Sequence, residues 1–111
     1  MEFTFSQIAG HLVVEPDTER LDLANAGDFL SGCEARLAGH EGGGRVVIDL
    51  GGVQFIDSTG LGALVAVRRA LRDPSALRLV SANPRVRLLT EMTRLDRVLP
   101  VVATVREAVA A

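Results

Sequence analysis

The segment from residue 46 to residue 64 reads VVIDLGGVQFIDSTGLGAL and decides the fold of this chain. Its β-branched, almost wholly apolar start is typical of a central strand that is covered on both faces. A second apolar run follows at residues 53–56, and the polar turn Asp57-Ser58-Thr59-Gly60 then opens an apolar helix. This helix is expected to run to about Arg72, because the proline of Asp73-Pro74 cannot continue it.

Segments typical of strands and helices alternate along the rest of the chain, which favours a layered α/β domain. The first two strands are expected to pair as a hairpin across Ala9-Gly10, and residues 39–44 to form a flexible turn. Asn83 is expected to cap a helix that turns Val86, Leu88, Leu89 and Met92 inward. The expected strands are 3–8, 11–15, 45–50, 77–81 and 101–102, and the expected helices are 23–37, 58–72, one from residue 84 and one after the capping box that begins at Thr104.

Composition indicates a single globular domain covering residues 1–111, with 48% hydrophobic and 23% charged residues. The net charge is −2 and the 12 basic residues are scattered, so nucleic acid is not an expected partner. All 12 are arginine, which is the codon bias of a GC-rich, bacterial genome. The single cysteine, Cys33, falls on the apolar side of a predicted helix and is expected in the core of a protein from a reducing compartment. No signal sequence and no long apolar run is present, so we expect a cytoplasmic protein without membrane insertion.

The sequence does not favour an enzyme. Ser58 and Asp57 would need a histidine as base, but His11 falls in a predicted strand and His40 in the glycine-rich turn, and there is no Gly-x-Ser-x-Gly motif. The glycines fit neither the phosphate loop nor the dinucleotide fingerprint, so no cofactor is expected. Asp49 and Asp57 alone are weak evidence for a metal site, and none is expected.

The turn that precedes the helix has a physical use beyond its structural one. Ser58 or Asp57 is expected to cap the helix and so satisfy its unpaired N–H groups. A phosphate on Ser58 would meet the positive end of the helix dipole, which tolerates it. It would also add about two negative charges beside Asp57 on a surface that faces a partner. Phosphorylation would then leave the fold intact while repelling the partner.

These residues resemble a STAS domain, the fold of bacterial anti-sigma factor antagonists. The resemblance is carried by residues 45–50 and 53–64, and it extends over essentially the whole chain. The other segments that match the family outline are residues 78–80, 84–89, 95–96 and 104–108. The resemblance implies a four- or five-stranded mixed sheet with helices packed largely on one face.

The same resemblance implies a function and a set of site residues. Ser58 would be the phosphoacceptor, with Thr59 as the alternative. The unphosphorylated form would bind an anti-sigma factor that is also a serine kinase, releasing a sigma factor, and a serine phosphatase would reverse the phosphorylation. ATP and magnesium would belong to the kinase. The implied partner-binding residues are Asp22, Asp57, Ser58, Thr59, Gly60 and Leu61.

One segment departs from the family pattern. Many members have a glycine-containing segment just before the Leu21-Asp22 pair, and residues 15–20 replace that segment here. The loop nearest the partner-binding surface is therefore altered, which affects the choice of partner more than the fold. Two alternative functions stay open: an accessory STAS subunit of a lipid-transport ATPase complex that is never phosphorylated, and a subunit of a stress-sensing assembly. An intact Ser58 favours the anti-sigma factor antagonist.

Overall fold

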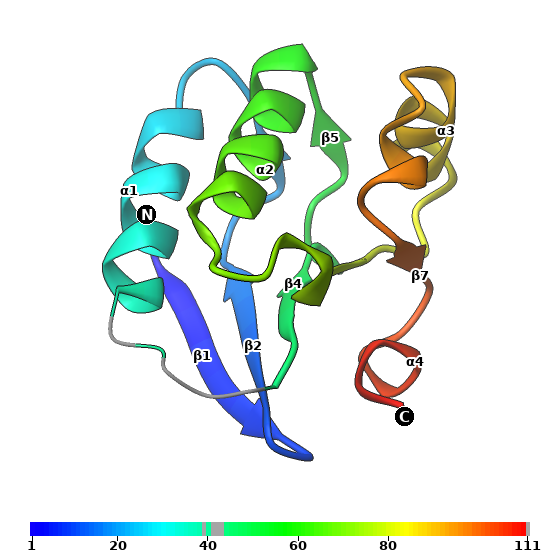
Figure 1. Cartoon of the computed structure of the whole chain (residues 1–111). Helices are drawn as coiled ribbons and strands as arrows, with labels where there is room; N and C mark the ends of the chain where they lie inside the picture. The colour runs from blue at the N-terminus through cyan, green and yellow to red at the C-terminus, as the bar shows by residue number, and fades with distance from the viewer. Residues whose placement is uncertain (39, 41–43, 111) are drawn as a thin grey trace.

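A five-stranded sheet in the order β1-β2-β4-β6-β7 forms the centre of the computed structural model, which describes residues 1–38, 40 and 44–110 (Figure 1). β1 (Phe3–Ile8) pairs antiparallel with β2 (His11–Pro16), and the remaining neighbours pair in parallel. These are β4 (Val46–Asp49), β6 (Leu77–Val80) and β7 (Val101–Val102). The predicted mixed sheet is therefore confirmed, with five strands.

The N-terminal hairpin turns where the sequence predicts. Ile8 lies opposite His11, so the loop consists of Ala9 and Gly10 alone. Their φ angles are 53° and 82°. A two-residue hairpin with positive φ at both loop positions matches the right-handed twist of the strands.

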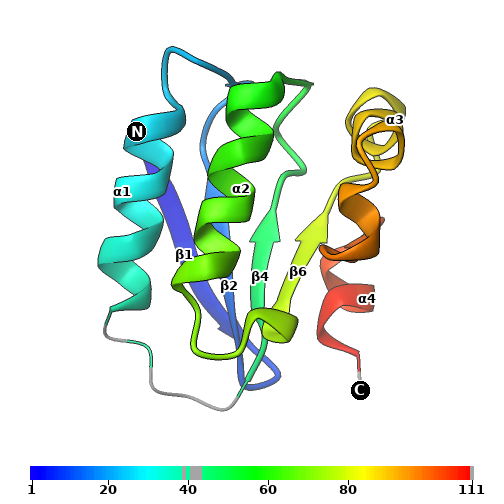
Figure 2. The same ribbon diagram turned by 45° about the horizontal axis from the view of Figure 1, so that its top comes forward.

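Two helices cover one face of the sheet. α1 (Ala26–Leu37) and α2 (Ser58–Ala70) lie side by side in front of the strands (Figure 2). Val46 and Ile48 of β4 belong to the main core cluster, which these helices share. The strand residue between them, Val47, points to the other face because side chains alternate along a strand.

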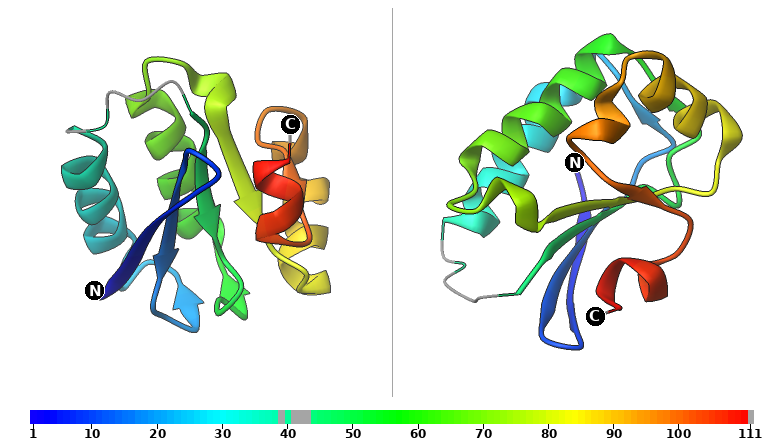
Figure 3. Two further views of the ribbon diagram at one scale, coloured as in Figure 1. Left: turned by 90° about the horizontal axis from the view of Figure 1, so that it is seen from below. Right: turned by 45° about the vertical axis from the view of Figure 1, so that its right-hand side comes forward.

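The opposite face carries one short helix, α4 (Val105–Val109), which the sheet separates from α1 and α2 (Figure 3). Its Ala108 packs in a second cluster with Val13, Val47 and Val80. The predicted arrangement, with helices largely on one face, is thus confirmed. The predicted cap of α4 is also present, since Thr104 Oγ1 accepts a hydrogen bond from the Glu107 amide at 3.2 Å.

The helix α3 (Pro84–Met92) is capped as predicted but buries a different stripe. Asn83 Oδ1 accepts a hydrogen bond from the Arg85 amide at 2.9 Å. Val86 and Thr90, four residues apart, are the buried positions. Leu88 and Met92 are 55% and 72% exposed, so the prediction that they point inward is wrong. They form a second stripe with the same spacing, rotated toward solvent.

The short elements lie near the ends of the sheet. β3 (Arg20–Leu21) and β5 (Phe55–Ile56) form a separate two-stranded parallel sheet, and β3 has no counterpart in the sequence prediction. The predicted flexible turn at residues 39–44 falls largely outside the described residues. None of the described helices has the length and apolar character needed to cross a membrane. The described residues also include two short 3₁₀ helices, Pro74–Ala76 and Leu95–Arg97.

Candidate functional site

The two-stranded sheet brings two loops that are distant in sequence to the same end of the molecule. Leu21 of β3 lies opposite Ile56 of β5. The Asp57 amide then donates a hydrogen bond to the Leu21 carbonyl at 3.3 Å. The turn at residues 22–25 therefore lies beside the first turn of α2, where the sequence places the candidate site.

Asp57 holds this junction together through both of its carboxylate oxygens. Oδ1 accepts a hydrogen bond from the Gly60 amide at 2.8 Å, which makes Asp57 the N-cap of α2. Oδ2 accepts one from the Leu23 amide at 3.1 Å. The bond from the Gly60 amide is the main reason why the pKa of Asp57 lies below its usual value of 3.8, with the Leu23 amide adding to the effect. Of the two caps that the sequence leaves open, the structure shows Asp57.

Ser58 and Thr59 are the first two residues of α2 and both are exposed. Because α2 begins at Ser58, a group attached to its hydroxyl would lie at the N-terminal end of a helix of 13 residues. The unpaired N–H groups and the dipole at such an end favour negative charge. This geometry suits a phosphate, in keeping with the physical argument from the sequence.

Gly60 and Leu61 support the turn from beneath. A Cβ added at Gly60 would lie 2.3 Å from the Leu21 carbonyl oxygen and 2.8 Å from Ile56 Cγ1, so only glycine fits there. Leu61 is 6% exposed and belongs to the main core cluster. The buried Gly60 and Leu61 therefore fix the position of the turn, while Ser58 and Thr59 form the exposed surface of the site.

Asp22, which the resemblance implies as a partner-binding residue, lies at the same end of the molecule and shapes the neighbouring turn. Its Oδ1 accepts a hydrogen bond from the Ala24 amide at 3.1 Å, and its amide donates to Asn25 Oδ1 at 3.0 Å. Its Oδ2 lies 3.1 Å from Arg20 Nε. These bonds delay the start of α1 to Ala26, three residues after the predicted start.

Two exposed apolar residues near Ser58 were missed by the sequence reasoning. Leu23 was expected at the start of the helix predicted over residues 23–37 but lies in the turn, where it is 77% exposed. Phe55 is 45% exposed, and the Arg20 guanidinium lies 4.2 Å from the centre of its ring. The turn-forming residues Asp22 and Asn25 around Leu23 were the available signal.

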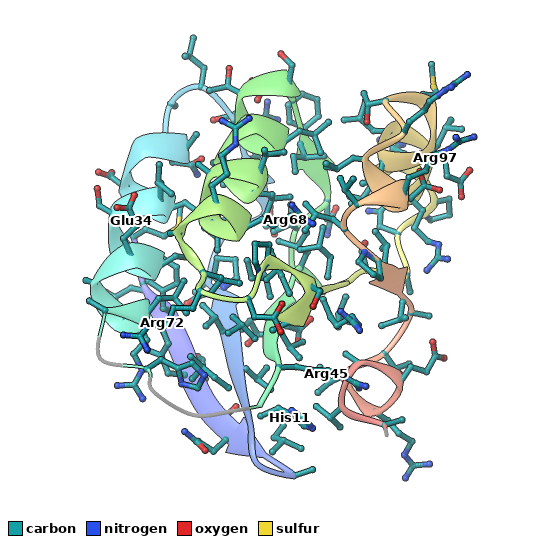
Figure 4. The ribbon with its side chains drawn as sticks, viewed as in Figure 1. His11, Glu34, Arg45, Arg68, Arg72 and Arg97 are labelled. Carbon is teal, nitrogen blue, oxygen red and sulfur yellow. The ribbon has the colours of Figure 1, made fainter. Side chains whose placement is uncertain are left out.

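Neither histidine lies near Ser58. His11 lies at the end of the molecule where the first hairpin turns, whereas α2 begins at the opposite end (Figure 4). His40 lines a hollow with Leu71 and Arg72, just beyond the C-terminal end of α2. A helix of 13 residues is about 20 Å long, so this histidine is also far from the hydroxyl. In the part of the chain that the structure describes, no three His, Cys, Asp or Glu residues are grouped to hold a metal ion.

Comparison with known proteins assigns the family. The sequence model of the STAS domain matches residues 2–108, and no curated protein sequence matches the chain. An anti-sigma factor antagonist from Mycobacterium paratuberculosis shares 26% identity over 96% of this chain and 89% of its own, with a TM-score of 0.85. The STAS domain protein of Planctomyces limnophilus, described as an anti-sigma-factor antagonist, shares 24% identity over 96% of this chain and 94% of its own, with a TM-score of 0.83. The phosphorylated form of SpoIIAA, a cell fate determinant of Bacillus, shares 18% identity over 96% of each chain, with a TM-score of 0.63, which shows the common fold. The chain belongs to the STAS domain family.

Proposed function

We propose that this chain is a cytoplasmic anti-sigma factor antagonist whose binding is switched off by phosphorylation of Ser58. The observation that carries the proposal is the exposed hydroxyl of Ser58 at the first position of α2, directly after the capping Asp57. The similarity to an antagonist from Mycobacterium paratuberculosis over nearly the whole of both chains supports the function. That the Bacillus protein of the same fold has a phosphorylated form supports the switch.

The surface around Ser58 suits a protein partner. The Leu23 side chain projects into solvent from a turn that is hydrogen-bonded to Asp57. Exposed apolar side chains beside fixed polar groups are typical of protein contacts. A phosphate on Ser58 would place about two negative charges beside Asp57 and Leu23, and a partner would have to desolvate these charges to bind. The unmodified surface would therefore bind and the phosphorylated one would not.

The partner in this proposal is an anti-sigma factor with serine kinase activity. It brings its own ATP and magnesium, so this chain supplies only the acceptor hydroxyl and the docking surface. A serine phosphatase then restores Ser58. Thr59 is exposed next to Ser58 and is the alternative acceptor.

An affinity pull-down from the host cytoplasm tests the proposal with Ser58→Ala, Ser58→Asp and Thr59→Ala baits. Ser58→Ala is expected to change the free energy of unfolding by about 0.5 kcal/mol or less, because the cap belongs to Asp57. It should retain the kinase and carry no phosphate, and Thr59→Ala should retain the kinase and be phosphorylated. Ser58→Asp should weaken binding of the kinase through like-charge repulsion and desolvation.

Two outcomes would contradict the proposal. Phosphorylation of the Ser58→Ala bait at the same yield as wild type would place the modification elsewhere. Equal recovery of transporter ATPase subunits on the alanine and aspartate baits would favour the accessory subunit of a lipid-transport complex.

A further inference from the structure

We propose that the free edge of β1 pairs with β1 of a second copy of this chain, forming a two-fold symmetric dimer with one continuous sheet. β1 is the outer strand of the five-stranded sheet, and among the described residues it pairs with β2 alone. Its other side therefore offers backbone hydrogen-bonding groups to an extended partner.

The register of the hairpin identifies which backbone groups point outward. Pairs in an antiparallel ladder alternate between those that exchange two hydrogen bonds and those that exchange none. The Asp17 amide donates to the Glu2 carbonyl at 2.9 Å, so the even-numbered residues of β1 bond to β2. The N–H and C=O groups of Phe3, Phe5 and Gln7 accordingly face away from β2.

This edge lacks the features that usually prevent edge-to-edge pairing. Natural edge strands are kept short, charged, bulged or interrupted by proline. β1 has six residues, Phe3-Thr4-Phe5-Ser6-Gln7-Ile8, with neither a charge nor a proline. Phe5 and Ile8, on opposite faces of the strand, are 37% and 40% exposed. An uncharged strand would gain both hydrogen bonds and apolar contact here.

A second copy is the partner that fits this edge. The opposite edge of the sheet is β7, which has only two residues, so copies cannot add head to tail through a long ladder. Two β1 strands can pair antiparallel about a two-fold axis, which closes the assembly as a dimer. With Phe5 opposite its own copy, Phe3 lies opposite Gln7, and all the outward groups pair in about six backbone hydrogen bonds. If any other residue of β1 lay at the two-fold axis, some of the outward N–H and C=O groups would have no partner.

The charge near the axis gives the dimer a recognisable signature. The Arg36 guanidinium lies 5.1 Å from the centre of the Phe5 ring. The two Phe5 rings would meet across the axis, which brings the two Arg36 side chains close together. Salt screens repulsion between exposed charges. Association is therefore expected to become stronger as the salt concentration rises.

Sedimentation equilibrium of the full chain tests the proposal, with Gln7→Pro and Gln7→Val as a matched pair. Proline removes an outward N–H from each copy without touching the bonds between β1 and β2, and valine keeps it. Gln7→Pro should raise the dimer dissociation constant about tenfold or more, while Gln7→Val should stay near wild type. Circular dichroism checks that the proline variant is folded.

Oxidative cross-linking tests the register even if the proline variant fails to fold. Phe5→Cys should form a disulfide dimer, because position 5 lies opposite itself, whereas Ser6→Cys should cross-link poorly, since position 6 lies opposite Thr4. The native Cys33 is 1% exposed and burial raises the pKa of its thiol to about 12, so it does not compete. Three results would overturn the proposal. One is a wild-type chain that stays monomeric up to millimolar concentration. The others are equal dissociation constants for the two Gln7 variants and equal cross-linking at positions 5 and 6.

Discussion

At the scale of single residues, the carboxylate of Asp57 couples the site to the stability of the fold. It accepts one hydrogen bond within α2 and one from Leu23, which lies 34 positions away in the sequence. Both bonds are stronger to the ionised form, and the bond from the Gly60 amide above all places the pKa in the folded state below the ordinary value of 3.8. The stabilisation is therefore fully present above pH 3.8 and is lost as the pH falls through the lower folded-state pKa.

Asp57→Asn tests this coupling. The difference in unfolding free energy between wild type and variant should be constant near neutral pH and should shrink in acid, below the ordinary carboxyl pKa of 3.8. Urea unfolding at a series of pH values measures this difference. A difference that stays the same down to the lowest pH would show that the carboxylate charge has no part in holding the turn at residues 22–25 against α2.

At the scale of elements, α4 depends on the rest of the molecule for its existence. Five residues are too few for a stable isolated helix. The Arg45 side chain at the start of β4 reaches across to the end of α4 (Figure 4). Its Nη1 donates to the carbonyl of Ala108 at 3.0 Å and also to that of Ala110. A charged donor at the last carbonyls of a helix satisfies groups that have no partner within it.

Arg45→Met should loosen α4 while leaving the sheet intact. The methionine keeps much of the apolar stem and removes the donor, at an expected loss of about 1–3 kcal/mol in unfolding free energy. In the variant, amide hydrogen exchange in α4 should become faster than in the wild type, while exchange in β4 should stay the same. Arg106→Met, which changes an exposed arginine on α4 itself, is the control and should leave exchange unchanged. Equal protection of α4 in both variants would contradict this role for Arg45.

Elements with a local signal could be predicted from the sequence, and elements set by tertiary contacts could not. Asn83 and Thr104 predict the starts of their helices from the sequence, because the hydrogen bond of a cap joins residues that are at most three positions apart. Leu23 was misplaced because its exposure follows from a bond to Asp57, far along the chain. At the site, the position of Ser58 at the start of α2 was predictable, but the neighbouring turn was not. In α3, the buried pair Val86 and Thr90 has the same spacing as the exposed pair Leu88 and Met92, so the periodicity cannot show that Leu88 and Met92 face solvent.

At the scale of the whole molecule, the tight packing beneath the site should control global stability. Gly60→Ala forces a methyl group against the Leu21 carbonyl and should lower the unfolding free energy by about 1–3 kcal/mol. Gly62→Ala, two residues along the same helix, meets no atom within 4 Å and should raise it by about 0.5–1 kcal/mol. Together they provide a destabilised and a stabilised chain that differ by the position of one methyl group.

The buried Cys33 thiol can report that stability. It lies in the core between α1 and the sheet, and burial, aided by the charge of Glu34, raises its pKa to about 12, so a thiol reagent reaches it only when the core opens. If opening is global, the rate of modification should change about tenfold for each 1.4 kcal/mol of unfolding free energy, faster in Gly60→Ala and slower in Gly62→Ala. A rate that is the same in both variants would mean that α1 detaches locally without unfolding the sheet. We expect the exponential dependence because α1 and α2 pack on each other and share one core cluster with the sheet, so detaching α1 alone would also expose apolar surface of α2 and of the sheet.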